Sequence, residues 1–168
     1  SSTDEAERVA RAILGMDIKG ITVRKVLVAA AADIAREFYM AAVLDRAAGR
    51  ILLMGSAEGG VEIEQVAVDH PEAIVRHHAD PMLGLLDFQA REFAFAMGLG
   101  AHLKAAVGIA KGLVRTMLAY DADIVEINPL AIVRETGADG ASIERLVCLD
   151  AKVTLDDSAL ARHPQLES

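Results

Sequence analysis

The sequence holds few of the residues that would indicate a disulfide framework, a base-stacking surface or a membrane span. Cys148 is the single cysteine among 168 residues, which excludes an intramolecular disulfide and a thiolate metal cluster. Tryptophan is absent and aromatic residues make up only 4%, which disfavours a surface that stacks bases. No apolar run approaches the roughly 20 residues of a spanning helix, and the N-terminus has no signal-peptide pattern. We therefore expect a cytoplasmic protein with no membrane segment.

Basic residues are also few. Lys and Arg number 17 against 25 Asp and Glu, so the formal net charge is −8, and the cations are scattered along the chain. Nucleic-acid partners need clustered cations to replace counterions, so the charge argues against this class of partner. The length and the 53% hydrophobic content fit one domain, residues 1–168, with a core of Val, Leu, Ile, Ala and Met. Cys148 lies among Leu and Val and is expected to be a packed thiol.

Hydrophobic periodicity predicts a mixture of strands and helices. Ser2 to Glu5 resembles a capping box, which predicts a short first helix that ends before Gly15. The two strands on either side of the 45–50 turn favour an antiparallel meander, on which the later helices pack. Strands are expected at 24–32, 37–44, 51–57, 124–133 and 143–153, and helices at 61–67, 87–97 and 102–120, with a last helical turn near 156–160.

The segment Glu126-Ile127-Asn128-Pro129-Leu130 is the most informative part of the chain. Successive side chains of a strand point to opposite faces, so Glu126 and Asn128 should point the same way. The same alternation places Leu130 and Ile132 on that face as well. On the return strand, Cys148, Asp150 and Lys152 would likewise share one face.

A turn centred on Asp139-Gly140, a strong turn dipeptide, would place Asn128 opposite Asp150 and Glu126 opposite Lys152. Cross-strand Cβ atoms lie about 4.5–5.5 Å apart, so an amide oxygen and a carboxylate can share one hard cation such as Mg²⁺. The alternative is a solvated Glu–Lys pair beside a turn on a generic α+β binding domain.

The glycines and histidines give weaker signals. Gly59-Gly60 lies at a strand-to-helix switch, where a tight turn is favoured over a phosphate cradle because no Lys-Ser/Thr follows. None of the five histidines forms a metal-type pair with an acidic neighbour, so we interpret them as structural or surface groups. His77 and His78 would point to opposite faces of a strand, which argues against a joint site.

Taken in order, several segments resemble the β subunit of succinyl-CoA synthetase (succinate–CoA ligase), a member of the ATP-grasp acyl-CoA ligases. The resemblance runs nearly end to end and implies an α+β fold, an ATP-grasp subdomain whose mainly antiparallel sheet is packed with helices. The segments that carry it are 25–28, 33–39, 43–46, 56–64, 89–92, 126–130 and 149–152.

The resemblance implies specific residue roles. Asn128 and Asp150 would hold the Mg²⁺ of the nucleotide, ATP or GTP, and Glu37 would contact the nucleotide. Glu126 would help to orient a histidine of the partner α subunit that is phosphorylated during turnover. At Ala29 the family usually has Glu, so any nucleotide contact there would come from the main chain.

The resemblance also implies a reaction and its partners. ATP, succinate and CoA would be interconverted with ADP, phosphate and succinyl-CoA, a reaction of the tricarboxylic acid cycle, in a heterodimer or heterotetramer with the α subunit. The family's glycine-rich loop would precede this segment and its CoA-ligase domain would follow it. CoA and the dicarboxylate would therefore bind mainly elsewhere, and this part alone should be inactive. A malate–CoA ligase, or a non-catalytic regulatory subunit marked by Ala29, stays open.

Overall fold

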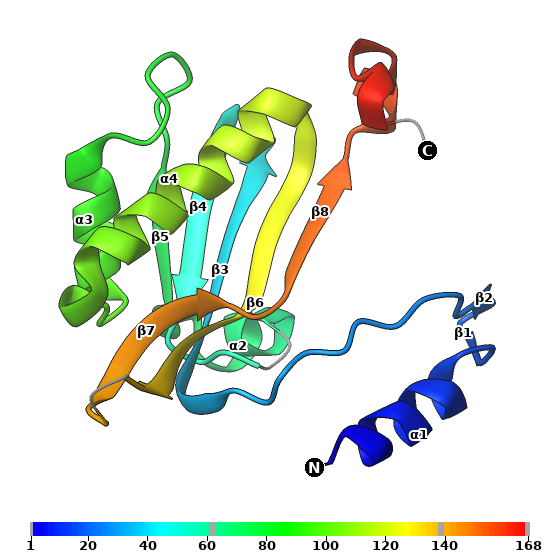
Figure 1. Cartoon of the computed structure of the whole chain (residues 1–168). Coiled ribbons are helices and arrows are strands. Elements are labelled where there is room, and N and C mark those ends of the chain that lie inside the picture. Colours follow the sequence, from blue (N-terminus) through cyan, green and yellow to red (C-terminus); the bar gives the residue numbers. More distant parts are fainter. Residues whose placement is uncertain (1, 61–62, 138–139, 167–168) are drawn as a thin grey trace. The chain divides into compact units, whose positions relative to one another are not determined.

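A computed structural model describes residues 2–60, 63–137 and 140–166 (Figure 1). The chain separates into two compact units, Ser1–Ala32 and Asp33–Ser168, and each is described by itself. The expected single domain over 1–168 stays a prediction. Among the helices of the described residues, none has the length and apolar character needed to cross a bilayer.

The first unit contains one helix and a short hairpin. Helix α1 (Thr3–Ile13) begins as the capping-box pattern predicts, because the backbone N–H of Glu5 donates to Oγ of Ser2 over 3.2 Å. Strands β1 (Asp17–Ile18) and β2 (Ile21–Thr22) pair with each other. The strand expected at 24–32 is wrong: these residues belong to no strand, because no described segment pairs with their backbone.

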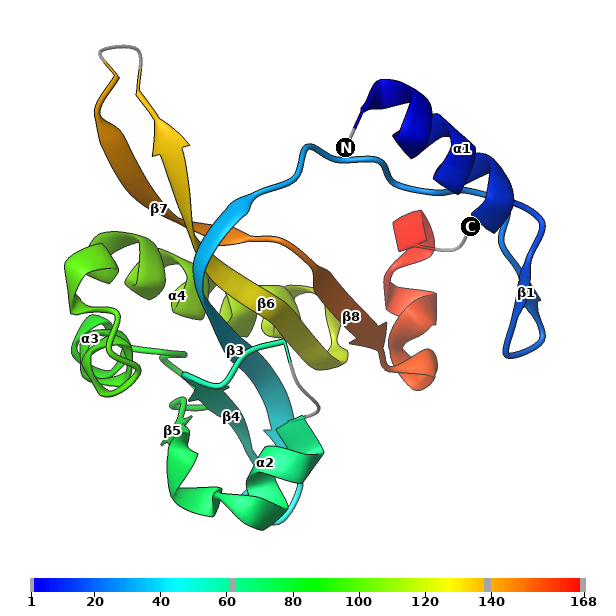
Figure 2. The ribbon, with the colours of Figure 1, turned by 90° about the horizontal axis from the view of Figure 1, so that it is seen from below.

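The second unit is built on a six-stranded antiparallel sheet in the order β5-β4-β3-β6-β7, with β8 beside β6. Strands β3 (Asp33–Asp45) and β4 (Arg50–Ser56) form the expected meander. The turn between them is fixed by Asp45, whose Oδ1 accepts hydrogen bonds from the N–H groups of Ala47 and Ala48 over 3.1 and 3.0 Å. Strand β6 (Ala122–Thr136) lies between β3 and the return strands, and the β6–β7 hairpin projects beyond the other strands (Figure 2).

Helices cover both faces of this sheet. Helices α3 (Asp87–Ala96) and α4 (Leu103–Tyr120) pack on one face, where the main core includes Phe38, Phe93 and Leu130, each fully buried (Figure 1). Helix α2 (Ile63–Asp69) packs on the opposite face with Tyr39 and Ala41. The predicted α+β fold with a mainly antiparallel sheet is confirmed.

Several elements differ from the sequence-based predictions. Strand β5 (Ile74–His78) was not expected, and the expected strand 143–153 divides into β7 (Ser142–Cys148) and β8 (Ala151–Leu155). The last helical turn is a 3₁₀ helix, η3 (Asp157–Arg162). Shorter 3₁₀ helices are η1 (Pro71–Ala73), η2 (Gly100–His102) and η4 (Pro164–Leu166). On β5, His77 lies 3.3 Å from Glu92 and His78 lies 2.9 Å from Asp45, so the two rings have separate partners, as expected.

The alternation of faces along β6 changes at Asn128-Pro129. Val125 and Ile127 belong to the main core, and so do Leu130 and Ile132, which were expected on the opposite face. The reason is a bulge: between two consecutive pairs with β3, Phe38–Leu130 and Met40–Ile127, strand β6 advances three residues and β3 only two. The extra residue returns the apolar side chains to the core beyond Asn128.

The packed thiol expected at Cys148 is also wrong, because Cys148 is exposed. It is the last residue of β7, which among the described strands pairs with β6 alone. A residue at the end of an edge strand has no neighbouring strand on its outer side.

We expect Phe93→Ala to lower the free energy of unfolding by about 3–5 kcal/mol, because the ring is fully buried in the main core. Phe95 provides a matched control on the same helix, since it is 60% exposed and its truncation should cost less than about 1 kcal/mol. Urea denaturation of both variants measures the difference. Equal losses would contradict the placement of Phe93 in the core.

Candidate functional site

The return strands bring the predicted site residues together. Glu126 pairs with Lys152, and the N–H of Asn128 donates to the carbonyl oxygen of Asp150 over 3.2 Å. The predicted register is confirmed. The Asp139-Gly140 turn from which it was inferred lies partly outside the described residues.

These residues line a cavity of about 1030 Å³ on the α2 side of the sheet. Asn128 and Glu126 come from β6, Asp150 from the two residues between β7 and β8, and Lys152 from β8. Glu58, Glu64 and Asp69 add carboxylates to the wall, which therefore has five acidic side chains and one lysine. A polyphosphate would be repelled by such a wall unless a cation lay between them.

Glu126 is held by two side chains from different strands. The hydroxyl of Tyr39 on β3 donates to its Oε2 over 3.1 Å, and Nζ of Lys152 lies 3.8 Å from its Oε1. Lys152 is 67% exposed, so water screens this ion pair and it contributes little. Tyr39 is 2% exposed, and its hydrogen bond is the contact that fixes the carboxylate.

The protonation of Tyr39 supports this contact. Burial, and next the negative charge of Glu126, raise the pKa of the Tyr39 phenol well above its ordinary range. The hydroxyl therefore keeps its proton at neutral pH. It acts as a hydrogen-bond donor to the carboxylate throughout the physiological range.

Asn128 and Asp150 offer the oxygen ligands that a hard cation prefers. Oδ1 of Asn128 accepts a hydrogen bond from the N–H of Gly60 over 3.1 Å, which fixes the orientation of the amide. Oδ1 of Asp150 accepts from the N–H of Ala151 over 2.9 Å, and Oδ2 has no hydrogen bond from any described residue. Within the described ranges no three His, Cys, Asp or Glu form a metal-ligating group. An amide oxygen and a carboxylate would leave positions of a Mg²⁺ ion open for water and phosphate oxygens.

The two glycines that precede α2 allow the backbone to approach β3. A Cβ atom at Gly59 would clash with the main chain of Glu37 and Phe38, and one at Gly60 would clash with the carboxylate of Glu37. Gly60 also has a φ of +69°, which disfavours other residues. Glu37 thus lies against the loop that contacts Asn128.

Ala29 belongs to the first unit, and the residues of the cavity belong to the second. It lines a hollow of about 330 Å³ with Val26, Leu27 and the apolar side of α1. Its expected main-chain contact with the nucleotide stays a prediction, as does the role of Glu37.

Comparison with known proteins agrees with this arrangement. Residues 1–132 match the model of a protein family described as the ATP-grasp domain. The chain belongs to the ATP-grasp family. The fold is similar to that of the ATP citrate lyase of Methanosaeta concilii, solved as a point mutant in complex with (3S)-citryl-CoA. The TM-score is 0.60 at 20% identity, over 96% of this chain and 35% of that one.

Curated relatives of this ATP-grasp chain are β subunits of succinate–CoA ligase. The ADP-forming enzyme of Roseiflexus sp. is 54% identical over 98% of this chain and 42% of its own length. The GDP-forming enzyme of Thermus thermophilus is 48% identical over 96% of this chain and 41% of its own length. The ATP-grasp chain thus spans about two fifths of the length of these relatives.

Sequence reasoning did not find Tyr39. Alternation along the 37–44 strand indicates which face Tyr39 occupies, but Glu126 is 87 residues away, and their contact depends on how β3 pairs with β6. A tyrosine within the otherwise apolar run 38–44 was the available signal, since a buried hydroxyl usually has a partner.

We expect Tyr39→Phe to lower the free energy of unfolding by about 1.5 kcal/mol, because it removes one hydrogen bond to a carboxylate while the ring remains. Tyr120→Phe is the matched control, since that ring is 41% exposed and no hydrogen bond of its hydroxyl occurs among the described residues. Its effect should lie within about 0.5 kcal/mol. Chemical denaturation at pH 7 compares them, and an unchanged midpoint for Tyr39→Phe would contradict the contact.

Proposed function

We propose that this chain is the nucleotide- and Mg²⁺-binding part of the β subunit of an ADP-forming succinate–CoA ligase. The supporting observation is the convergence of Glu126, Asn128 and Asp150 on one cavity. The names of the relatives support the same reaction, ATP, succinate and CoA giving ADP, phosphate and succinyl-CoA. The other part of the relatives' length would bind CoA and the dicarboxylate, so the described part should be inactive alone.

Asn128 and Asp150 would hold the Mg²⁺ of the nucleotide. When bound, the ion neutralises phosphate charge and leaves coordination positions for phosphate oxygens and water. The chain's own residues orient these ligands: Gly60 fixes the amide of Asn128, and the Asn128–Asp150 backbone hydrogen bond keeps the two residues opposite each other. Glu37, held against Gly60, would contact the nucleotide beside them.

Glu126 would orient a histidine of the partner α subunit. Its carboxylate faces the same cavity as the proposed metal ligands, and Tyr39 prevents it from turning away. A carboxylate hydrogen-bonded to one nitrogen of an imidazole keeps the other nitrogen available to accept a phosphoryl group. The histidine then carries the phosphoryl group between ATP and the acid. Because this histidine is itself the nucleophile, this chain needs to supply none and contributes by positioning the reacting groups.

The nucleotide and the compartment are proposed from the relatives and from the reaction. The curated relatives include ADP-forming and GDP-forming enzymes at similar identity, so ATP is proposed and GTP is the alternative. A cytoplasmic location, in a heterodimer or heterotetramer with the α subunit, is proposed with the reaction.

Asp150→Ala in the full-length subunit should weaken nucleotide binding about tenfold or more when Mg²⁺ is present, because a ligand of the ion is lost. With EDTA in place of Mg²⁺, the variant should bind the nucleotide at least as well as wild type, because the lost carboxylate then only repels the phosphates. Asp69→Ala is the control. It removes another carboxylate of the same cavity, one that accepts a hydrogen bond from Gln65 over 2.7 Å, and it should keep the Mg²⁺-dependent affinity of wild type. Calorimetric titration with ATP and with GTP gives all the values. Equal binding by Asp150→Ala and wild type in Mg²⁺ would contradict the metal role.

Glu126→Gln should slow phosphorylation of the α subunit by ATP about 100-fold and leave the nucleotide affinity unchanged, because misplacement of a reacting group affects the chemical step. Glu64→Gln removes a charge from the same cavity and should keep the wild-type rate. Rapid-quench measurement of the phosphorylated subunit compares the variants. A wild-type rate in Glu126→Gln would contradict the proposal that this carboxylate orients the histidine of the α subunit.

A further inference from the structure

Lys152 is the only lysine or arginine among the described residues that line the cavity of the candidate site. The cavity wall also carries five carboxylates, from Glu58, Glu64, Asp69, Glu126 and Asp150. A nucleotide that enters the cavity adds the negative charges of its phosphates, so each carboxylate disfavours it and a nearby cation favours it. Among these charged side chains, Lys152 is the one whose charge attracts a polyphosphate.

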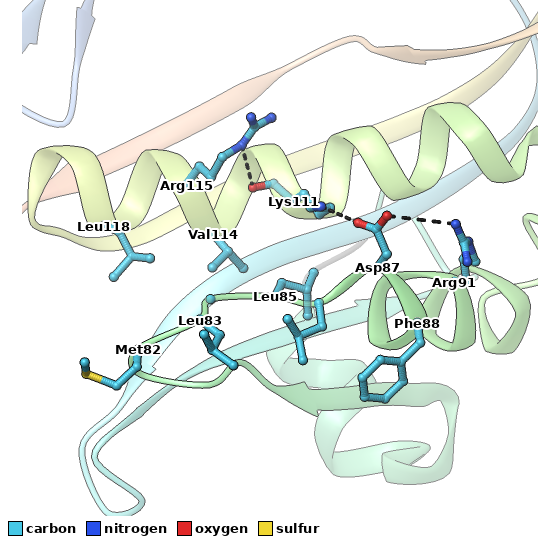
Figure 3. Close-up of a pocket in the computed structure, with 12 residues that line it drawn as sticks. Met82, Leu83, Leu85, Asp87, Phe88, Arg91, Lys111, Val114, Arg115 and Leu118 are labelled. Atoms are coloured by element: carbon cyan, nitrogen blue, oxygen red, sulfur yellow. Dashed lines mark hydrogen bonds and ion pairs between the residues drawn. The ribbon is translucent and has the colours of Figure 1, made fainter.

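Glu126 holds Lys152 only loosely. Nζ of Lys152 lies 3.8 Å from Oε1 of Glu126, which is an ion-pair distance and too long for a hydrogen bond. On the opposite face of the sheet, Lys111 donates a hydrogen bond to Asp87 and is 36% exposed, against 67% for Lys152 (Figure 3). An exposed ion pair between flexible side chains contributes little free energy. Lys152 can therefore leave Glu126 at small cost.

Lys152 also lies close to the proposed ligands of Mg²⁺. It is the second residue of β8 and follows Asp150 by two positions, a distance of at most about 7 Å along the chain. Both side chains line the cavity, and so does Asn128, which is held opposite Asp150. The ammonium of a lysine sits on a flexible stem of four carbon atoms. It can therefore reach the phosphate oxygens of a nucleotide whose Mg²⁺ is bound at this hairpin.

The two carboxylate oxygens of Glu126 have different neighbours. Oε2 accepts a hydrogen bond over 3.1 Å from Tyr39, whose side chain is buried. Oε1 accepts no hydrogen bond from a described residue, and its neighbour is Lys152. When Lys152 moves to a phosphate, Oε1 becomes available to another hydrogen-bond donor. Tyr39 keeps the carboxylate in place during this exchange.

We propose that Lys152 binds the terminal phosphoryl group of the nucleotide and that this contact releases Oε1 of Glu126. The proposal rests on the proposed function, which places a Mg²⁺–nucleotide in this cavity. A phosphoryl group offers several charged oxygens at once, so it is a stronger partner for the ammonium than one exposed carboxylate. A diphosphate lacks the terminal group, and Lys152 then stays beside Glu126. The histidine of the α subunit would thus find Oε1 available only when a phosphoryl group is present for transfer.

Two other roles of Lys152 make different predictions. A fixed cross-strand pair with Glu126 would support the hairpin and would leave the affinity for every nucleotide unchanged. A general contribution to the charge of the cavity would favour diphosphates and triphosphates alike. The proposed contact with the terminal phosphoryl group affects triphosphates alone. A comparison of the two nucleotides therefore separates the three roles.

The test uses the full-length subunit assembled with its α subunit, in Mg²⁺, and calorimetric titration. The probes are ADP and adenylyl imidodiphosphate, a triphosphate analogue that is not cleaved, or their guanine counterparts if wild type prefers them. Lys152→Met should raise the dissociation constant of the triphosphate analogue about tenfold and change that of ADP less than about twofold. Lys152→Arg keeps the positive charge and should recover most of the affinity for the analogue.

Lys104→Met is the matched control, because it makes the same substitution at an exposed lysine of α4 that lines a different hollow. It should bind both nucleotides as wild type does. Thermal unfolding shows whether a variant is folded, and Lys152→Gln replaces Lys152→Met if the latter lowers the melting temperature.

Two results would overturn the role of Lys152 and leave the ligase function standing. The first is wild-type affinity of Lys152→Met for the triphosphate analogue, which would indicate a fixed cross-strand pair. The second is an equal loss of affinity for the analogue and for ADP, which would indicate a general effect of charge. If the folded wild-type complex binds neither adenine nor guanine nucleotides, the proposed function fails and the role of Lys152 fails with it.

Discussion

The extra residue of β6 at Asn128-Pro129 is the constraint on which the arrangement of the site depends. Strand β6 is central: β3 pairs with one edge, and β7 and β8 pair with the other. One of its faces packs in the main core and the other lines the cavity. A strictly alternating strand would place Leu130 and Ile132 on the same face as Glu126 and Asn128. Either the polar pair would then enter the main core or the apolar pair would line the cavity. The bulge removes this conflict, because the two apolar residues return to the core just past Asn128.

The same bulge explains how a rigid sheet supports a polar site. Before it, Glu126 pairs with Ala41 and lies on the face of Tyr39, which is buried against α2. Tyr39 therefore connects the smaller core to the carboxylate through one hydrogen bond. Since packing fixes the Tyr39 ring, its hydrogen bond restrains the orientation of the Glu126 carboxylate. At the bulge, Asn128 is held by Gly60 in a similar way, from a loop that only glycines can bring so close to β3.

Local patterns in the sequence predict most of the elements and the register of the hairpin that carries Asn128 and Asp150, and they fail where the outcome depends on distant pairing. Helices α3 and α4 follow from their apolar spacing, and the Glu126–Lys152 register follows from one turn. The 24–32 segment has the composition of a strand, but a strand exists only with a neighbour. The bulge was not predicted, because it is defined by the count of residues on β3 against those on β6. Tyr39 was missed for the same reason, since its partner is set by that pairing.

The two faces of the sheet therefore differ in charge as well as in packing. The α2 face carries five carboxylates and one lysine around the candidate site, a charge pattern that a polyphosphate tolerates only together with a cation. The face covered by α3 and α4 carries a hollow lined by apolar side chains and by three cations, Arg91, Lys111 and Arg115, although acids outnumber bases in the chain as a whole. The candidate site and the main core under α3 and α4 depend on the same sheet, because β3 and β6 direct alternate residues to each side. A substitution that shifted the pairing of β6 by one residue would exchange those directions and disturb both at once. The register of β6 against β3 is thus the feature that keeps a polar site and an apolar core in one thin layer.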